Sequence, residues 1–542
     1  MQASGDSAQR ASPLSETAVF SRAAVAAPHA FAAEAGRDVL AQGGDAIEAM
    51  VAMAATISVV YPHNVSIGGD GFWLIREPGG RVRAIEACGY AGAGASIAAY
   101  RALGLDAVPL RGPKAAVTVP GALGGWALAL ELSCARGGRL PLPSLLEDAA
   151  RRARDGYPVS ASEARVDPTS DPDLVAAPGF ADAFMVDGKP AAAGAIRRAP
   201  RLADALEQLG RAGLADFYRG DVGREIAADL ERIGAPITRD DLMGYRAVWR
   251  EPLSLRLNKA TLYNTPAPTQ GLAALMLLGL YERLALGKPE GFAHAHALIE
   301  AAKRAMAIRD QTCVDFAHAT QDFAALLSAA NLDREAAQID MRRAAPWPLK
   351  PDKGGTVWMG AIDAAGLAVS FIQSVFWDFG SGCVLPGAGV LMQNRGAAFS
   401  LDPKSRNPLN PGRRPYHTLN PPRAVFDDGR VLVYGSKGAD GQPQFQAQVF
   451  TRVAAGAPLD EALAAPRHVL TRAWGEPAAT VKLEDGYDDS TAAALVAAGH
   501  AIERKSAAER DSFGHAGALM RSPKGEIAAA HDPRSDGGAA GL

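Results

Sequence analysis

The sequence predicts a mixed α/β protein of the α+β kind, in which strands and helices are interspersed. Two β-branched and apolar runs at residues 353–374, joined by a short turn that ends in glycine, have the pattern of a β-hairpin. Stretches at residues 30–40 and 46–59 have the pattern of helices instead. The two kinds of segment follow one another without regular βαβ alternation and without an internal repeat.

The composition allows a large core and argues against several classes of partner. The chain has 542 residues, 48% of them hydrophobic, and its length alone suggests several domains. A net charge of −3 gives no electrostatic basis for binding nucleic acid or an anionic membrane. No stretch reaches the ~18 uncharged apolar residues of a membrane span. The first 23 residues lack the apolar core of a secretory signal, so we expect a cytoplasmic protein.

The four cysteines do not indicate a metal site. Cys88, Cys134, Cys313 and Cys383 lie far apart and form no C-x-x-C pair. We therefore expect reduced, buried thiols and no zinc. No other metal and no cofactor are expected, although metal binding by His29 and His63 is kept as an alternative.

The N-terminal elements can be assigned in order. Residues 1–17 are polar and small, and we expect a disordered tail there. Two glycines end the first helix and Asp45 caps the second. A glycine-rich segment at residues 68–71 precedes a strand instead of linking a strand to a helix, so it does not have the context of a phosphate-binding loop.

The middle of the chain is predicted to be rich in helices. Residues 124–242 have this character, and residues 296–309 form a further long helix. Its charged residues are expected on a solvated face: Glu300, Lys303 and Arg304.

The predicted hairpin brings two hydroxyl groups together. If the turn ends at Gly366 with a positive φ, opposed residue numbers sum to 730, and Thr356 then faces Ser374. Opposed residues have Cβ atoms roughly 4.5–5.5 Å apart, so the hydroxyls are within reach of one another. A shift of one residue in the turn breaks this pairing. A purely structural alternative, in which both hydroxyls satisfy nearby backbone groups, stays open.

The hairpin also resembles the processing site of the γ-glutamyltransferase family, in which Gly-Gly-Thr precedes such a hairpin and a second hydroxyl residue follows 18 positions later. The resemblance extends from about residue 24 to residue 542. It includes residues 61–75, where Asp70 replaces a glycine of the family, residues 435–439, and the terminus at 531–541.

This resemblance implies the fold of an N-terminal-nucleophile hydrolase, a four-layer αββα sandwich. It also implies a precursor cut between Gly355 and Thr356. The products are a large subunit, residues 18–355, and a small subunit, residues 356–542, which together form one catalytic domain. Pairing of two such heterodimers is left open.

The chemistry that the resemblance implies needs only one residue for both the nucleophile and the base. A threonine at a free N-terminus carries the nucleophilic Oγ and a base, its α-amine, on one residue. An unperturbed α-amine has a pKa of ~7.7–8, close to working pH. Thr356 is thus the implied nucleophile and Ser374 orients it. The N–H groups of Gly438 and Ala439 match the family's oxyanion hole, but Ala439 replaces a glycine. A negative φ would make this change tolerable, whereas a positive φ would count against it.

The implied pocket has lost its ligands for glutamate. Where the family holds the α-amino group, this chain has Arg395 and Ala398, and Phe376 replaces the family's Asn. A guanidinium cannot bind an ammonium, but it pairs bidentately with a carboxylate. The implied substrate is therefore a small anionic amide without an α-ammonium. The predicted substrate-binding residues are Asn394, Arg395, His417 and Thr418. The alternative that Arg395 forms a structural pair with an aspartate stays open.

Within the family, residues 371–374, 379–382, 393–403 and 440–444 resemble the oxamate amidohydrolase sub-group, which acts in purine catabolism. The implied function is hydrolysis of a small carboxylate-bearing amide such as oxamate. Glutathione hydrolysis or γ-glutamyl transfer, and a cephalosporin-acylase-like activity, are the enzymatic alternatives. An unprocessed relative that only binds a small anion is the non-enzymatic one.

Overall fold

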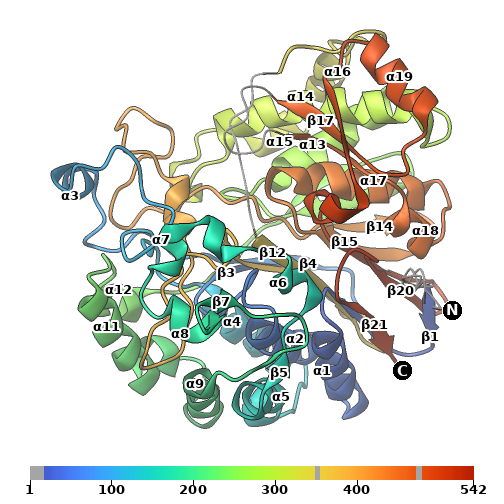
Figure 1. Cartoon of the computed structure of the whole chain (residues 1–542). Helices are drawn as coiled ribbons and strands as arrows, with labels where there is room; N and C mark the ends of the chain where they lie inside the picture. Colours follow the sequence, from blue (N-terminus) through green and yellow to red (C-terminus); the bar gives the residue numbers. More distant parts are fainter. Residues whose placement is uncertain (1–16, 348–354, 472–478) are drawn as a thin grey trace, which may run out of the picture.

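A computed structural model describes residues 17–347, 355–471 and 479–542. The predicted tail, 1–17, lies outside these ranges except for Thr17, whose hydroxyl donates to an Asp460 oxygen at 2.5 Å. The structure has four layers, helices–sheet–sheet–helices, and it confirms the predicted αββα sandwich (Figure 1).

Two seven-stranded antiparallel sheets form the inner layers. The first has the order β21 (Gly538–Gly541), β2 (Ala24–Ala27), β12 (Gly355–Ile362), β13 (Ala368–Phe376), β3 (Asp70–Arg76), β4 (Val82–Ala87) and β9 (Val248–Arg250). The second has the order β1 (Ala18–Phe20), β20 (Ile527–His531), β19 (Ala516–Arg521), β15 (Val431–Ser436), β14 (Arg423–Phe426), β11 (Ala260–Asn264) and β10 (Leu253–Arg256).

Helices cover the outer face of each sheet. The first sheet is covered by α1 (Ala30–Ala41), α2 (Ala46–Val60), α4 (Ala122–Ala135) and α5 (Leu142–Asp155). The second is covered by α13 (Gly271–Arg283), α14 (Gly291–Thr312) and α17 (Gln442–Ala454). The predicted boundaries of α1 and α2 are confirmed to within two residues, and Asp45 forms a capping box with Glu48 at the start of α2.

Smaller elements extend the layers. Between α5 and β9 lie β5 (Tyr157–Pro158), α6 (Ala161–Ala164), α7 (Pro172–Val175), α8 (Phe180–Phe184), β6 (Met185–Val186), β7 (Lys189–Pro190), β8 (Ile196–Arg197), α9 (Pro200–Ala212), α10 (Asp216–Arg219), α11 (Asp221–Ile233) and α12 (Arg239–Gly244). The others are α3 (Ile97–Ala102), α15 (Phe323–Leu326), α16 (Ala329–Ala336), α18 (Leu459–Ala464), β16 (His468–Thr471), β17 (Thr480–Glu484), α19 (Asp489–Ala497) and β18 (Ile502–Lys505).

The two-residue period of β12 and β13 decides which side chains face the site. Val357 and Phe371 pack into the core beneath α2, whereas Trp358 and Ile372 pack between the two sheets. Alternate residues of a strand point to opposite faces, so Thr356 lies on the same face as Trp358. The start of β12 thus turns its hydroxyl toward the space between the sheets.

The hairpin register agrees with the prediction along most of its length. Pairs from Val357–Gln373 to Ile362–Ala368 are in register, and Gly366 has a φ of 83°. Gly355 pairs with Phe376, however, so an irregularity lies between Gly355 and Val357. The extra residue in β13 is a bulge, a feature that often occurs beside active sites and re-aims side chains.

Two expectations about burial were wrong. Glu300 and Lys303 are only 3% and 5% exposed, because α14 packs within the outer layer and these two charges pair with each other at 2.6 Å. Cys134 is exposed, whereas Cys88, Cys313 and Cys383 are buried as predicted; all four are free thiols.

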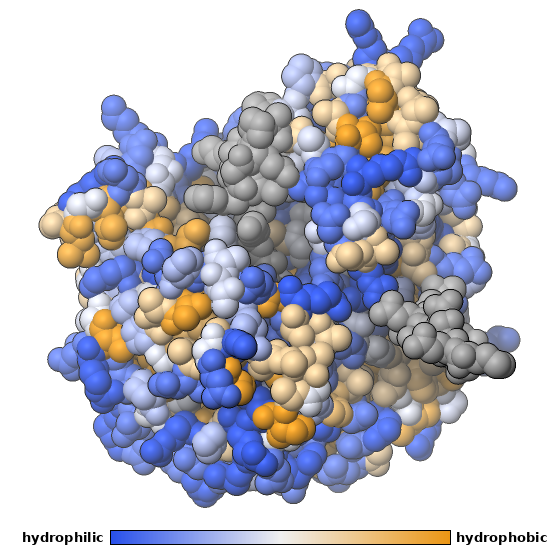
Figure 2. Space-filling view, viewed as in Figure 1, coloured by the Kyte–Doolittle hydropathy of each residue, from blue (hydrophilic) through white to orange (hydrophobic). Residues whose placement is uncertain are grey.

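Among the described residues, the helices are all too short or too polar to cross a membrane. On the face shown in Figure 2, hydrophobic residues form small groups separated by hydrophilic ones.

Candidate active site

The predicted hydroxyl pair forms at the start of β12. Thr356 Oγ donates to Ser374 Oγ at 3.2 Å. Ser374 Oγ in turn donates to the carbonyl oxygen of Gly355 at 2.5 Å and accepts the N–H of Phe376 at 2.7 Å. Both hydroxyl residues are buried. Ser374 therefore contacts both the hydroxyl of Thr356 and the carbonyl of the peptide bond that precedes it.

Asn64 is a site residue that the sequence analysis missed. Its Oδ1 accepts the backbone N–H of Thr356 at 3.1 Å, although the two residues are 292 positions apart. Asp378 also lies here: a Cβ on Gly355 would sit 2.9 Å from its Oδ1 and 3.0 Å from Asn64 Oδ1. A side chain at position 355 would crowd these groups, which gives a steric reason for glycine before Thr356.

The predicted oxyanion loop follows β15. Gly438 has a φ of 129°, and a Cβ there would lie 2.6 Å from Phe445, so only glycine fits. Neither the Gly438 nor the Ala439 N–H has a hydrogen-bond acceptor within the three described ranges. Both donors are thus available to a developing negative charge.

The negative φ that would make alanine tolerable at position 439 is not found, because the structure has a φ of 46°, and this positive value counts against the match to the family's oxyanion hole. An L-residue in this left-handed region is strained by roughly 1–2 kcal/mol. The conformation is held because the Ala439 carbonyl accepts the side-chain amide of Gln270 at 2.8 Å. Ala439 therefore adopts, under strain, a backbone conformation that glycine adopts without it.

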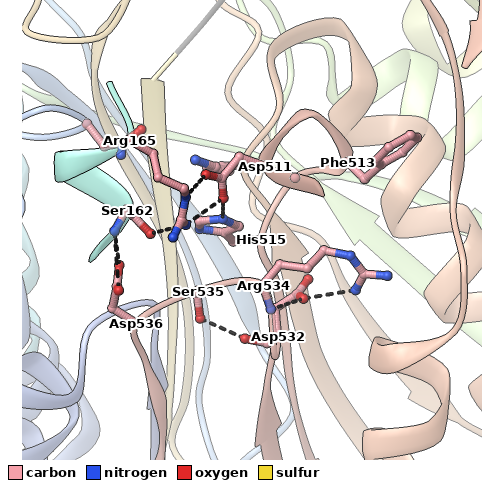
Figure 3. Close-up of polar contacts among 12 residues, drawn as sticks. Ser162, Arg165, Asp511, Phe513, His515, Asp532, Arg534, Ser535 and Asp536 are labelled. Atoms are coloured by element: carbon pink, nitrogen blue, oxygen red, sulfur yellow. Dashed lines mark hydrogen bonds and ion pairs between the residues drawn. The ribbon is translucent and has the colours of Figure 1, made fainter. Parts of the chain in front are cut away.

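A polar network that is buried at His515 and reaches the surface at Arg165 lies beside the predicted oxyanion loop. The Lys437 N–H donates to the carbonyl oxygen of His515 at 3.1 Å. The His515 ring contacts Asp511 at 2.8 Å, and Arg165 clamps the same carboxylate at 2.6 and 3.1 Å (Figure 3). Burial, opposed by the Asp511 charge and assisted by Lys437, lowers the pKa of His515 to about 4. His515 is therefore a neutral support at working pH and is not set up as a general base.

Arg395 lies in a buried group behind Ser374. Its guanidinium is 1% exposed and stacks 4.0 Å over the ring of Phe376, whose N–H holds Ser374 Oγ. Phe376 itself has a φ of 83°, an unusual value for a bulky residue and one that can mark a functional site. Phe376 thus contacts both the Arg395 guanidinium and Ser374 Oγ, so a single residue separates Arg395 from the hydroxyl pair.

Asp70 and His417 complete this buried group. Asp70 pairs with Ser374 across β3 and β13, and its Oδ2 lies 3.5 Å from His417 Nε2. Burial raises the pKa of Asp70 to about 7, although the Arg395 charge and two backbone N–H groups oppose this rise. Burial, with Arg395 nearby, lowers the pKa of His417. His417 is consequently neutral. The Arg395 charge acts on Asp70, so the alternative that Arg395 forms a structural ion pair with an aspartate stays open.

The two remaining predicted substrate-binding residues have structural contacts. The Asn394 side chain accepts the N–H of Trp377 at 3.1 Å and donates to the Leu110 carbonyl at 2.9 Å. The Thr418 carbonyl accepts the Gln270 amide at 2.5 Å. Both residues are buried, so the structure gives them a clear role in holding the loops around Arg395 and His417.

One group of possible metal ligands lies elsewhere, among the described residues: His296, Glu300 and His500. His296 Nδ1 and His500 Nε2 bond to each other at 2.8 Å, and the Glu300 carboxylate already carries the Lys303 ammonium at 2.6 Å. A bound cation would have to displace that ammonium, so this group is a hydrogen-bonded link between α14 and the segment after α19.

The sandwich, with a threonine at the start of an inner strand, defines a fold of the N-terminal-nucleophile hydrolase type. A model of the family described as Gamma-glutamyltranspeptidase matches residues 32–542. The chain therefore belongs to the gamma-glutamyltranspeptidase family, and it is an amidohydrolase of the N-terminal-nucleophile class.

Individual relatives cover nearly the whole chain. An oxamate amidohydrolase proenzyme from Klebsiella pneumoniae is 46% identical, over 95% of this chain and 97% of the relative. A glutathione hydrolase-like YwrD proenzyme from Bacillus subtilis is 34% identical, over 98% and 100%. The crystal structure of cephalosporin acylase from Bacillus halodurans superposes with a TM-score of 0.90 at 31% identity, covering 99% of both chains.

Proposed function

We propose that the chain is a precursor that cleaves itself between Gly355 and Thr356. The hydrogen-bonded chain from Thr356 Oγ through Ser374 Oγ to the Gly355 carbonyl oxygen carries this proposal. It joins the attacking hydroxyl to the oxygen that gains the electron pair. The proenzyme names of the two curated relatives support the same conclusion.

The proposed cleavage is an N-to-O acyl shift followed by hydrolysis. Thr356 Oγ attacks the Gly355 carbonyl carbon and passes its proton to Ser374, whose own proton moves to the carbonyl oxygen. The C–N bond breaks as the proton on the carbonyl oxygen passes to the Thr356 nitrogen, which frees the α-amine and leaves an ester on Oγ. Water then hydrolyses this ester, releasing the Gly355 carboxylate and restoring the Thr356 hydroxyl. The products are the proposed large subunit, 18–355, and small subunit, 356–542, one composite domain because β12 remains in the first sheet.

The mature enzyme uses the new α-amine as its base. The amine takes the Oγ proton as Oγ attacks the amide carbonyl of the substrate. The N–H groups of Gly438 and Ala439 hold the oxyanion, and Ser374 orients the nucleophile. Ammonia leaves with a proton from the amine, and water hydrolyses the acyl ester to release the acid.

The proposed substrate is a small amide that carries a carboxylate, with oxamate as the best candidate. Arg395 and His417 stand where the family would bind the amino-acid head group of glutamate, and Arg395 is the cation in this buried group that can pair with a carboxylate. A zwitterionic glutamyl group would leave its ammonium against a guanidinium, at a cost of several kcal/mol. The 46% identity to an oxamate amidohydrolase proenzyme supports this choice.

A second candidate is hydrolysis of a larger acyl amide. The overlap with the cephalosporin acylase structure, at a TM-score of 0.90, favours testing it. The chemistry at Thr356 would be unchanged, and only the acyl pocket would differ.

Two assays test the proposal. Denaturing electrophoresis should show the wild type as two chains and Thr356→Ala as one full-length chain. A panel of oxamate, other small amides, glutathione and an acylase substrate should then give the fastest release of ammonia from oxamate. Full activity in an uncleaved chain would overturn the mechanism, and faster release of glutamate from glutathione would overturn the substrate assignment.

A further inference from the structure

We propose that Asn64 positions the α-amine of Thr356 so that its lone pair faces Oγ, which makes Asn64 a positioning residue for the catalytic base. The inference rests on the proposed cleavage, because the amine exists only in the cleaved chain. The structure brings Asn64 to this place from the segment between α2 and β3.

The geometry of Asn64 is fixed from three sides. Its Oδ1 accepts the Thr356 N–H at 3.1 Å. Its backbone N–H donates to the Tyr61 carbonyl at 3.1 Å, and its carbonyl accepts the Val375 N–H at 3.3 Å. The bond from the Val375 N–H ties Asn64 to the residue next to Ser374. The acceptor for the Thr356 nitrogen and the partner of the Thr356 hydroxyl are therefore held in one rigid arrangement.

The side-chain amide shows the features of a group retained for function. Asn64 is fully buried, and within the described part of the chain its Nδ2 has no hydrogen-bond partner. A buried unsatisfied N–H costs about 1–3 kcal/mol, so this amide is not optimised for stability. The oxygen of the same amide holds the nitrogen of the peptide bond that is proposed to be cleaved.

Cleavage detaches Gly355 from the Thr356 nitrogen and converts that nitrogen into an amine, which in this proposal stays beside Asn64 Oδ1. A neutral amine has two hydrogens and one lone pair, and it can rotate about the N–Cα bond. Donating one hydrogen to Asn64 Oδ1 restricts this rotation and leaves the lone pair for the Oγ proton. A neutral acceptor suits this task, because a carboxylate at the same place would stabilise the ammonium, which cannot act as a base.

Other charged and titratable groups surround the amine. They are Asp378 after β13, Asp70 on β3, His63 before β3, Arg395 and His417 in the buried group beside Ser374, and Lys437, Asp511 and His515 near the end of β15. These groups set the baseline pKa of the amine in every variant. A shift caused by a substitution at position 64 therefore reports the contact with that position.

The test is Asn64→Asp, which keeps the shape and adds a charge. An opposite charge this close shifts a pKa by about 1–3 units, so the α-amine pKa should rise by that amount. The pKa is read from the pH dependence of α-amine acylation in the small subunit, measured by mass spectrometry without any substrate. The acid limb of kcat/KM should move upward by the same amount.

Asn64→Leu gives the complementary result. Removing the acceptor should lower kcat by up to about 10²-fold, as misplacement of a reacting group does, without raising the amine pKa. Asn331→Asp is the matched control, because Asn331 is a buried amide on α16 that bonds the Leu326 carbonyl at 2.7 Å, away from the site. The control should leave both the pKa and the acid limb unchanged.

The outcomes separate this inference from the proposed function. A cleaved, active Asn64→Asp enzyme with an unshifted amine pKa overturns the role of Asn64 alone. A wild-type chain that is never cleaved overturns the proposed function, and this inference with it. If the variants remain uncleaved, a crystal structure of the cleaved wild type decides: an amine within about 3.2 Å of Oδ1 supports the role, and an amine turned away refutes it.

Discussion

Replacing Ser374 by alanine should stop most of the cleavage at Gly355–Thr356. The substitution removes the hydroxyl that accepts the Thr356 proton at 3.2 Å and donates to the Gly355 carbonyl oxygen at 2.5 Å. It also leaves the buried N–H of Phe376 without its acceptor. Two separate effects follow, one on the rate of cleavage and one on stability.

The sizes of these effects can be set from the contacts. Loss of one donor to a developing oxyanion typically costs ~10²–10³ in rate, or about 2.7–4 kcal/mol. An orphaned buried N–H costs about 1–3 kcal/mol of folding free energy. The rate of cleavage should therefore fall by about a hundredfold or more, while the protein still folds.

The assay is a time course of denaturing electrophoresis on freshly purified protein. Ser374→Thr keeps a hydroxyl and should cleave far faster than Ser374→Ala. The matched control is Ser370→Ala, which removes a buried hydroxyl from the same face of β13, where it accepts Trp358 Nε1 at 2.9 Å. The control should lose stability and cleave normally. If Ser374→Ala cleaves within about threefold of wild type, the relay through Ser374 is wrong.

Three further predictions concern the pocket and the loop. Arg395→Gln should weaken binding of a carboxylate-bearing amide by about 2–5 kcal/mol, seen in KM, while an uncharged amide is unaffected; equal losses for both would contradict a carboxylate contact. Ala439→Gly should relieve the strained φ of 46° and keep the activity, with stability unchanged or higher by up to about 1 kcal/mol in urea; a large loss of activity would mean the methyl group is needed. Because burial raises the pKa of Asp70 to about 7, ionising it opposes folding, so the free energy of unfolding should fall between pH ~4 and ~7 by up to about 4 kcal/mol. Urea titrations of Asp70→Asn should show a flatter pH profile, and an unchanged profile would refute this origin.

The hairpin shows how far sequence reasoning reaches. Its register follows from a short turn and strand alternation, so the pairing from Val357 to Ile362 and the positive φ of Gly366 were predictable. The contact between Thr356 and Ser374 was predicted as well, but the bulge beside it was not. A bulge depends on how the strand end packs against its neighbours, and no local sequence pattern marked it.

The site residues that were missed come from distant segments. Asn64 reaches Thr356 across 292 positions, and Asp70 meets Ser374 only because β3 pairs with β13. The replacement of a glycine by Asp70 was visible in the sequence, and a carboxylate at a buried strand start was a signal that could have been followed. Asn64 gave no comparable signal.

The sequence by itself determined the alternation of the strands, the turn at Gly366, the helices capped near Asp45, and the hydroxyl pair of the hairpin, because each depends on residues close together in the chain. The tertiary structure decided the burial of Glu300 and Lys303, the strained φ of Ala439, and the contact of Asn64 with the Thr356 nitrogen. These features depend on which distant segments pack against one another, and that packing is set by the whole core.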